Sequence, residues 1–246
     1  MALSYNTGTT ASAITATSVN LTIPAGVLVN DLMVLAVTLF TTDATPPVVS
    51  ITGGTWTLVP VTTGTNPEVP AGGGVWSYDY AYVRTATGID PGATITLSET
   101  GSGAGTTWWA AAVASYTEAA FVDVAGGANA QGGGGTTVTC PAETTVAAGD
   151  WAVYAGGGAP GGGTNWTVPA GTTIRQQVVS AAGVGAVITD SNGSLPSGSS
   201  VGGGTFASSN PGATVWLSAF TLGLAPAGAP PPVNVPPVLY SMRTYP

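Results

Sequence analysis

The stretch Ile23-Pro-Ala-Gly-Val-Leu-Val-Asn-Asp-Leu-Met-Val-Leu-Ala-Val-Thr-Leu-Phe40 decides the fold. A Pro-Ala-Gly turn and the pair Asn30-Asp31 lead into nine almost wholly apolar residues, Leu32 to Phe40. Nine residues are too few to cross a bilayer as a helix, and such a run predicts a strand that is buried on both faces. A weaker copy follows at Val146-Ala-Ala-Gly-Asp150-Trp-Ala-Val-Tyr154. This repetition of an interior strand predicts two tandem β-domains.

The composition supports an all-β fold. Gly, Thr, Val and Ala dominate the 246 residues, Pro is frequent, and long charged helical faces are absent. We therefore expect two tandem antiparallel β-sandwich domains, jelly-roll-like or Ig-like, over residues 1–118 and 119–225. An extended Pro-rich C-terminal arm, 226–246, is expected to follow them.

Alternating and apolar runs between Gly- and Pro-rich segments predict the strands. In the first half they are 12–23, 32–40, 48–51, 56–61, 75–84, 93–98 and 106–116. In the second half they are 136–139, 150–155, 172–180, 184–189, 201–207 and 213–224. Residues 1–11 carry no pattern that predicts a structure, and the Gly-rich segment 156–163 is expected to be a connection. The Ala-rich run at 106–116 favours a strand because its flanks are β-rich.

The internal repeat allows two alignments. Pro91-Gly-Ala-Thr-Ile-Thr-Leu-Ser98 matches Pro211-Gly-Ala-Thr-Val-Trp-Leu-Ser218 at six of eight positions, 120 residues apart. By strand order, however, 213–224 closes the second half, which pairs it with 106–116 instead. The sequence leaves both alignments open.

Charge narrows the range of partners. Charged residues make up 6% of the chain, against roughly a quarter in a typical soluble domain, and the net charge is −8. The only cations are Arg84, Arg175 and Arg243, so we expect no nucleic-acid partner and no binding to anionic membranes or insertion into them. A surface with so little charge is poorly protected against association and predicts a homo-oligomer or a larger assembly.

The single cysteine and the N-terminus bear on the compartment. Cys140 has no partner for an intrachain disulfide, and we expect it to be a small, semi-buried apolar residue. Met1-Ala-Leu-Ser-Tyr5 has neither a basic region nor an apolar region of a standard signal peptide. Both features are consistent with folding in a reducing cytoplasm.

The residue types exclude most catalytic sites. The chain has no His and no Lys, which excludes Ser-His-Asp and Cys-His arrangements, imidazole metal sites, Schiff bases and Walker lysines. A carboxylate pair, as in glycoside hydrolases, remains conceivable among Asp79, Glu99, Glu118 and Glu143, but no pattern brings two of them together. Aspartates at the mouths of strands, such as Asp31 and Asp150, more often bind turn backbone. We therefore predict no catalytic, cofactor or metal site.

Two groups of aromatic residues are candidates for binding. On the alternating run 75–84, Trp76, Tyr78, Tyr80 and Tyr82 share one face, and Trp108-Trp109 place one ring on each face of their strand. Exposed rings of this kind could contact glycans, whereas packing in the core or between subunits is the commoner use of aromatic residues.

The last 22 residues, 225–246, are rich in Pro and favour an extended chain of roughly 65 Å, at about 3.1 Å per residue. Such an arm could dock on a neighbouring subunit. Its candidate anchors are the apolar residues Val238, Leu239, Tyr240, Met242 and Tyr245.

Several short motifs together resemble a β-sandwich module of virion structural proteins, especially minor tail proteins, of tailed phages that infect actinobacteria. They are Ile23-Pro-Ala-Gly-Val27 with Asp31-Leu-Met-Val-Leu-Ala-Val37, Trp56-Thr-Leu-Val59, Tyr82-Val-Arg-Thr-Ala86 and Asp90-Pro-Gly-Ala-Thr-Ile-Thr-Leu97. The resemblance covers residues 15–118 well and 136–224 loosely, and the second copy and the arm depart from it. It implies a non-enzymatic particle component with no catalytic residues.

Together, these features predict a minor tail or tail-tip protein that self-associates, docks through its arm on other virion proteins, and is assembled in the host cytoplasm. Two alternatives remain open. The first is a capsid decoration protein. The second is a carbohydrate-binding adhesin module that contacts a host surface glycan through the aromatic faces, with a glycoside hydrolase as a more remote reading.

Overall fold

The computed structural model describes residues 2–42, 47–59, 68–70, 76–100, 107–131, 136–145, 147–159, 166–208 and 216–229. Within these residues the regular elements are nineteen β-strands in five sheets, and no helix occurs. The paired strands run antiparallel. The all-β prediction is confirmed.

The first large sheet is built from residues that precede Glu118. Its strand order is β1 (Ser4–Ile14), β9 (Thr107–Thr117), β3 (Leu32–Thr41), β7 (Trp76–Thr85) and β5 (Thr57–Leu58), and β6 (Glu68–Pro70) also pairs with β7. A smaller sheet packs on one of its faces in the order β2 (Ser18–Thr22), β8 (Thr94–Thr100) and β4 (Val48–Ile51).

The second large sheet follows the same plan. Its order is β10 (Ala119–Gln131), β19 (Trp216–Pro226), β13 (Trp151–Ala159), β16 (Gly185–Asp190) and β15 (Thr173–Val179). Its outer face is covered by two small sheets: β11 (Thr137–Thr139), β18 (Thr205–Ser208) and β14 (Trp166–Thr167), and β12 (Glu143–Thr144) with β17 (Ser200–Val201).

Strand order decides between the two alignments of the repeat. In each large sheet the first strand pairs with the closing strand, β1 with β9 and β10 with β19. The closing strand then pairs with the interior strand that follows an aspartate, β9 with β3 and β19 with β13. The short Pro-Gly-Ala-Thr match fails this test because Thr94–Ser98 belongs to the small sheet, whereas Trp216–Ser218 belongs to a large one.

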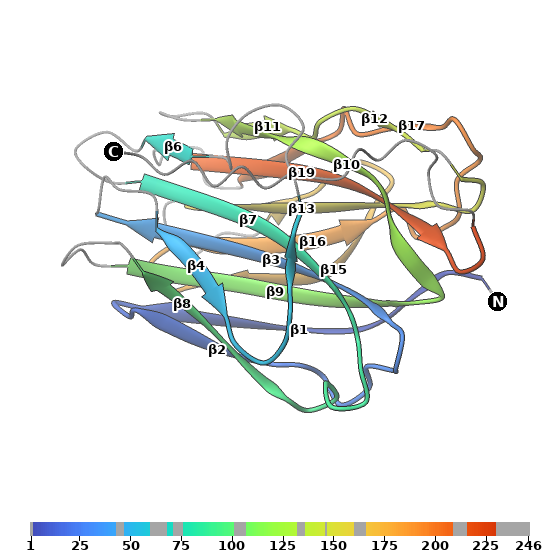
Figure 1. Ribbon diagram of the computed structural model, residues 1–246. Helices are drawn as coiled ribbons and strands as arrows, with labels where there is room; N and C mark the ends of the chain where they lie inside the picture. The colour runs from blue at the N-terminus through green and yellow to red at the C-terminus, as the bar shows by residue number, and fades with distance from the viewer. Residues whose placement is uncertain are drawn as a thin grey trace, which may run out of the picture.

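The two large sheets pack on each other face to face. Alternate residues of β3 point in opposite directions: Met33, Leu35 and Val37 face the small sheet, whereas Val34 and Ala36 face the second large sheet. The apolar run that begins at Leu32 thus forms a strand buried on both faces, as predicted. Figure 1 shows the long strands running across the molecule in roughly one direction, with β2, β4 and β8 on one side and β11, β12 and β17 on the other.

Small side chains make the contact between the large sheets close. Ala110, Ala112 and Ala114 of β9 lie in the shared core with Val153 and Ala155 of β13. This core draws on both halves of the chain, so each large sheet covers one face of the other. The Ala-rich run is a strand because its residues are buried on both sides, which confirms the preference for strand over helix.

Two predictions of local structure were wrong. Residues 4–11, whose polar sequence showed no pattern, belong to the edge strand β1, and the strand predicted at 12–23 is divided between the end of β1 and β2; pairing with β9 supplies the order of β1. Gly156–Gly158 belong to β13 and not to a connection. A Cβ at Gly156 would lie 3.0 Å from the Phe206 ring, so a close neighbour explains that glycine better than a turn does.

Candidate functional site

The turn before β3 forms one wall of a depression at the end of the molecule. Asp31 holds this turn: its Oδ2 accepts hydrogen bonds from the Leu28 N–H at 3.0 Å and from Asn6 Nδ2 at 2.7 Å. Asn6 Nδ2 also donates to the Gly26 carbonyl at 2.8 Å, which ties the turn to β1. Leu28 and Val29 stand at the tip with 54% and 57% of their surface exposed.

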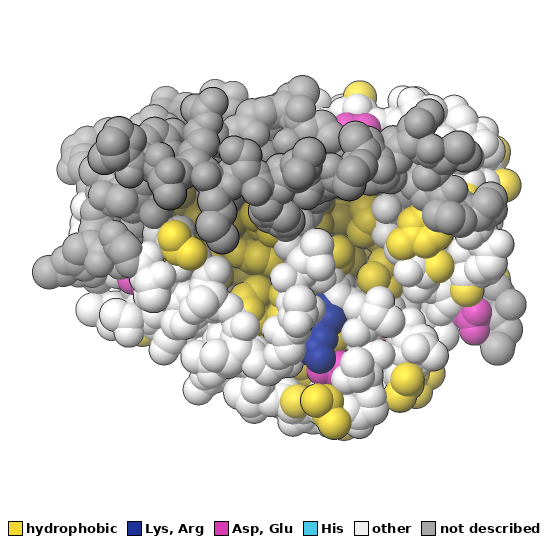
Figure 2. Space-filling view, in the orientation of Figure 1, with side chains coloured by type: hydrophobic (Ala, Val, Ile, Leu, Met, Phe, Trp, Pro, Cys, Tyr) yellow, Lys and Arg dark blue, Asp and Glu magenta, His cyan; other side chains and the backbone are white. Residues whose placement is uncertain are grey.

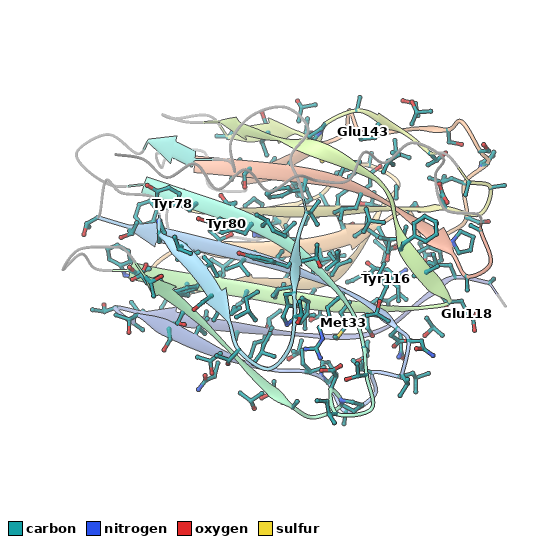
Figure 3. All side chains as sticks on the ribbon, in the orientation of Figure 1. Met33, Tyr78, Tyr80, Tyr116, Glu118 and Glu143 are labelled. Atoms are coloured by element: carbon teal, nitrogen blue, oxygen red, sulfur yellow. The ribbon has the colours of Figure 1, made fainter. Side chains whose placement is uncertain are left out.

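The opposite wall is the link between β9 and β10. Glu118 occupies the left-handed region with φ 61°, and its carbonyl accepts a hydrogen bond from Ala227 N–H at 2.6 Å. Figure 3 shows Glu118 where β9 turns into β10. The last described residue, Ala229, therefore lies near this link.

The depression between these walls has a volume of about 520 Å³, within the usual range of roughly 300–1,000 Å³ for ligand sites. We call it the end groove. It is lined by Leu28, Val29, Asn30, Asp31, Thr85, Thr117, Glu118, Ala119, Ala120 and Ala227. Half of these residues are polar, with Glu118 partly exposed, but the apolar surface of the groove exceeds its polar surface, which suits an apolar guest better than a charged small molecule.

The aspartates at the starts of strands accept hydrogen bonds from the backbone of the preceding turns. Asp150 Oδ2 accepts from the Ala147 N–H at 3.2 Å, the same three-residue spacing as Asp31 and Leu28. Asp90 repeats it with the Thr87 N–H and also pairs with Arg84 at 2.9 Å. The interpretation of Asp31 and Asp150 as turn-binding residues is confirmed.

Most of the buried carboxylates are bound by groups of their own chain. Asp79 accepts from Thr38 Oγ1 at 2.5 Å, Glu99 from Thr107 Oγ1 at 2.6 Å, and Asp190 from Arg175 Nε at 2.7 Å. Together with the three turn aspartates, these are the six buried acidic residues that the structure describes. Groups engaged in this way hold the fold and are poorly placed to reach a substrate.

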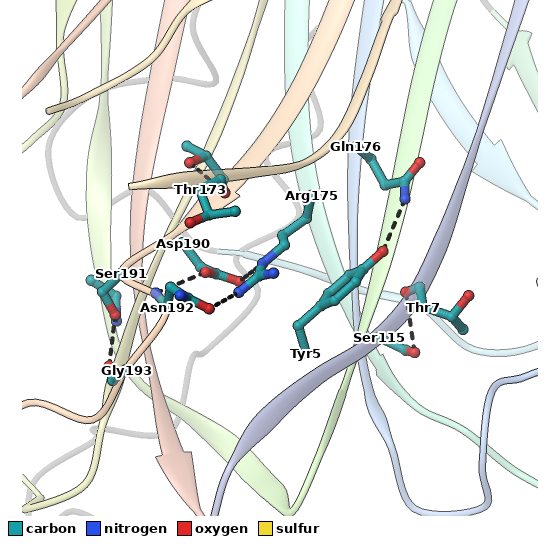
Figure 4. Close-up of polar contacts among 12 residues, drawn as sticks. Tyr5, Thr7, Ser115, Thr173, Arg175, Gln176, Asp190, Ser191, Asn192 and Gly193 are labelled. Atoms are coloured by element: carbon teal, nitrogen blue, oxygen red, sulfur yellow. Dashed lines mark hydrogen bonds and ion pairs between the residues drawn. The ribbon is translucent and has the colours of Figure 1, made fainter. Parts of the chain in front are cut away.

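Arg175 organises the largest polar cluster between the two large sheets. Its guanidinium bonds Asp190 and Asn192 and lies 4.6 Å from the centre of the Tyr5 ring on β1 (Figure 4). Gln176 Nε2 donates to Tyr5 Oη at 3.0 Å. Burial would lower the pKa of Arg175, but the bond to Asp190 and its charge raise that pKa above its usual value. The charge pair lies within the second large sheet, and the contacts of Arg175 and Gln176 with Tyr5 join that sheet to the first.

Tyr116 lies beside this cluster and is fully buried. Burial, together with the negative charge of Asp190, raises the pKa of Tyr116 well above its usual value, so the phenol stays neutral. Cys140 is also buried, and burial raises the pKa of its thiol to about 12. Neither side chain is prepared to act as a nucleophile.

The candidate aromatic residues lie mainly inside the chain. Tyr78, Tyr80 and Tyr82 are 1–7% exposed and pack between β7 and the small sheet, and Trp109 is fully buried beside them. Trp108 is partly buried on the other face against Phe40, with 5.5 Å between the ring centres. Rings packed in this way are unavailable to a sugar. The Trp76 side chain lies outside the described residues.

The four candidate carboxylates are on separate elements. Asp79 lies on β7 between the large sheets, Glu99 on β8, and Glu118 at the β9–β10 link. Glu143 lies on β12, and Figure 3 shows it well apart from Glu118. Among the described residues no group of three or more metal-binding side chains occurs. No helix in the described part of the chain could span a bilayer.

Comparison with protein-family models, with curated proteins and with solved structures gave no match. The arm anchors Val238, Leu239, Tyr240, Met242 and Tyr245 lie outside the described residues. The end groove was not predicted from the sequence, because its walls come from turns about 90 residues apart. The adjacent apolar residues Leu28 and Val29, in the turn that precedes β3, were the one local signal for the end groove.

Proposed function

We propose that this protein is a non-enzymatic structural component of a tailed phage particle, a minor tail or tail-tip protein that assembles with itself and with other virion proteins. The observation that carries the proposal is the use of the buried carboxylates. Each of the six is engaged by a turn, a hydroxyl or an arginine of the same chain. The buried acidic groups therefore stabilise the fold of this chain.

The finer architecture fits this role. We infer that residues 1–118 and 119–225 are tandem β-sandwich units, since each half supplies one large sheet and the small sheets that cover it. Their large sheets share a core, so the pair acts as one block. A rigid block of this kind suits a component that must hold its shape within a particle.

The surface favours association with other protein molecules over a freely dissolved monomer. Figure 2 shows a face on which uncharged groups predominate and charged side chains are few. Exposed apolar residues add to it: Leu28, Val29, Val48 and Ile89 are each more than half exposed. Few like charges oppose contact between copies, and apolar contacts would stabilise it.

The arm 226–246 is proposed to dock on a neighbour. Its first residues are fixed to the body through Ala227 and the Glu118 carbonyl, so the root of the arm has a defined place. Replacing Leu239, Tyr240 and Met242 by Ser in the full chain should remove the protein from particles. Replacing three polar, exposed residues of the body by Ser should leave the protein in the particles.

Localisation tests the proposal directly. Particles purified from a producing lysate would be labelled with a gold-conjugated antibody against residues 1–225. Label at the tail supports a tail protein. Label over the head replaces that assignment with capsid decoration, in which the arm binds between capsid subunits. Protein that stays free in the lysate, with bare particles, overturns the structural role altogether.

A further inference from the structure

We propose that the end groove receives the apolar segment Val238–Tyr245 from the arm of a second copy of this chain. The inference rests on the arm-mediated assembly proposed above and names the receiving surface, which the sequence left open.

The end groove offers apolar surface that the described part of the chain leaves exposed. Leu28 and Val29 are more than half exposed on its rim, and Ile89 on the adjacent turn is 80% exposed. The two turns are neighbours, since a Cβ at Gly88 would lie 4.0 Å from the Val29 side chain. Three large exposed aliphatic residues in one place indicate a contact surface.

The walls of the groove are held in costly backbone conformations. Asn30 and Glu118, which face each other across it, both have positive φ, 74° and 61°. A non-glycine residue in this region is strained, and such strain gathers at binding sites. Hydrogen bonds from Asn30 N–H to the Ala86 carbonyl and from Ala227 N–H to the Glu118 carbonyl hold both residues in place.

Charge favours the arm as the guest. All eleven acidic residues precede position 230, whereas residues 230–246 contain Arg243 and no acidic residue. Arg243 lies among the apolar anchors, and Glu118 lies among the apolar residues of the groove. Of the two carboxylates that line the groove, Asp31 is buried and bound by its own turn, which leaves the partly exposed Glu118 to meet the one cation of the segment.

The distance along the arm favours a second copy. Eight residues, 230–237, separate the described end at Ala229 from Val238, and five of them are proline. A segment of this composition favours an extended conformation that spans about 25 Å at about 3.1 Å per residue. The apolar segment would thus begin well away from the groove beside its own root, but within reach of the groove of a neighbour.

Disulfide trapping between full-length chains tests the inference. Val29→Cys protein would be mixed with Tyr240→Cys protein under mild oxidation, and the native Cys140 would not interfere because it is 1% exposed. Docking should raise the yield of the mixed dimer about tenfold over a control in which Ile174→Cys replaces Val29→Cys. Ile174 is a matched control because it is an exposed aliphatic residue, 43% exposed, on β15. Equal yields would overturn the inference.

The double variant Val29→Cys with Tyr240→Cys separates the two sources of the arm. Docking between copies gives covalent dimers and longer chains. A cross-linked monomer as the main product at high dilution would show that the arm folds back on its own groove, and would overturn the second-copy assignment.

Charge reversal tests the expected pair by sedimentation. Glu118→Arg and Arg243→Glu should each weaken self-association about threefold, and the two changes together should restore it. If the double variant lost as much self-association as the two single changes added together, the result would contradict the pairing.

These results are separable from the fate of the proposed function. Mixed dimers at the control level, with gold label present on particles, would reject the groove and leave the particle role standing. Specific dimers from a protein absent from every particle would reject the particle role and leave the groove standing.

Discussion

Asp79 and Asp190 lie on the same interface between the two large sheets and are stabilised in opposite ways. Asp190, opposite Val153 on β13, is paired with the Arg175 guanidinium at 2.7 Å. Asp79 lies against Gly157, four residues further along β13, or about 13 Å at about 3.3 Å per residue. Its hydrogen-bond partners there are hydroxyl groups, of which Thr38 Oγ1 is the nearest at 2.5 Å.

The difference shows what a buried carboxylate needs. Burial raises the pKa of Asp79 from 3.8 to about 7, although the hydroxyls of Thr38, Ser218 and Ser77 lower it. At Asp190 a cation supplies compensation that hydroxyl dipoles do not match. One end of the interface therefore holds an ion pair, and the other holds a carboxyl group whose pKa lies near neutral pH.

The largest effect is expected for Asp79→Asn. Because the pKa of Asp79 is higher in the folded than in the unfolded state, its ionisation makes the free energy of unfolding fall as pH rises from about 4 to above 7. The loss amounts to about 4 kcal/mol at pH 8. Asn cannot ionise, so the variant should be the more stable protein at pH 8 and nearly equal at pH 4.

Urea unfolding of both proteins across this pH range checks the expectation. A variant whose stability falls with pH as steeply as that of the parent protein would show that Asp79 does not titrate in this window.

Arg175→Met removes the compensation at the other end. Asp190 has no exposed side-chain surface, so its charge would be left buried and unpaired at a cost of about 3 kcal/mol at pH 7. Adding Asp190→Asn to the same protein should recover much of it, as thermal and urea unfolding would show. No recovery would mean that lost packing against Tyr5 causes the damage.

Gly157→Ala tests how tightly the sheets approach at Asp79. The added Cβ would lie 2.0 Å from both Asp79 Oδ1 and Thr38 Oγ1, so the sheets must separate, at a cost of about 2 kcal/mol. Gly193→Ala is the control, because its Cβ would meet nothing closer than 4.0 Å. Equal stability of the two variants would contradict the close approach.

The smallest effect is expected for Thr38→Val, which keeps the shape and removes the hydroxyl. The hydrogen bond from Thr38 lowers the pKa of Asp79, so its loss should raise that pKa further. The protein should be about 1 kcal/mol less stable at pH 8, and less affected at pH 4, where Asp79 is protonated. In the Asp79→Asn background this dependence on pH should disappear.

Local patterns in the sequence predicted the interior strands well. Leu32–Phe40 is preceded by turn residues and is apolar throughout, and both features act within a few residues of each other. The same holds for the aspartates of the turns, since Asp31 and Leu28 are three positions apart. Such short-range signals fixed the all-β class and the position of β3 before any long-range contact was known.

Other features had no local signal. β1 is polar and is ordered by β9, about 100 residues later, and Tyr5 of the same strand meets Arg175, 170 residues later. The end groove likewise requires the turn before β3 and the β9–β10 link to meet. These contacts depend on which sheets pack together, and no window of sequence contains both partners.

The sequence by itself determined the strand class, the turns that start the interior strands, the low charge and the Pro-rich composition of residues 226–246, because each depends on neighbouring residues. Tertiary structure alone decided that Gly157 is a strand residue, that the tyrosines of β7 are buried, and that hydroxyl groups bind Asp79 whereas an arginine binds Asp190. The physical reason is that burial and electrostatic compensation are properties of packed sheets. They arise only when residues far apart in the chain are brought together.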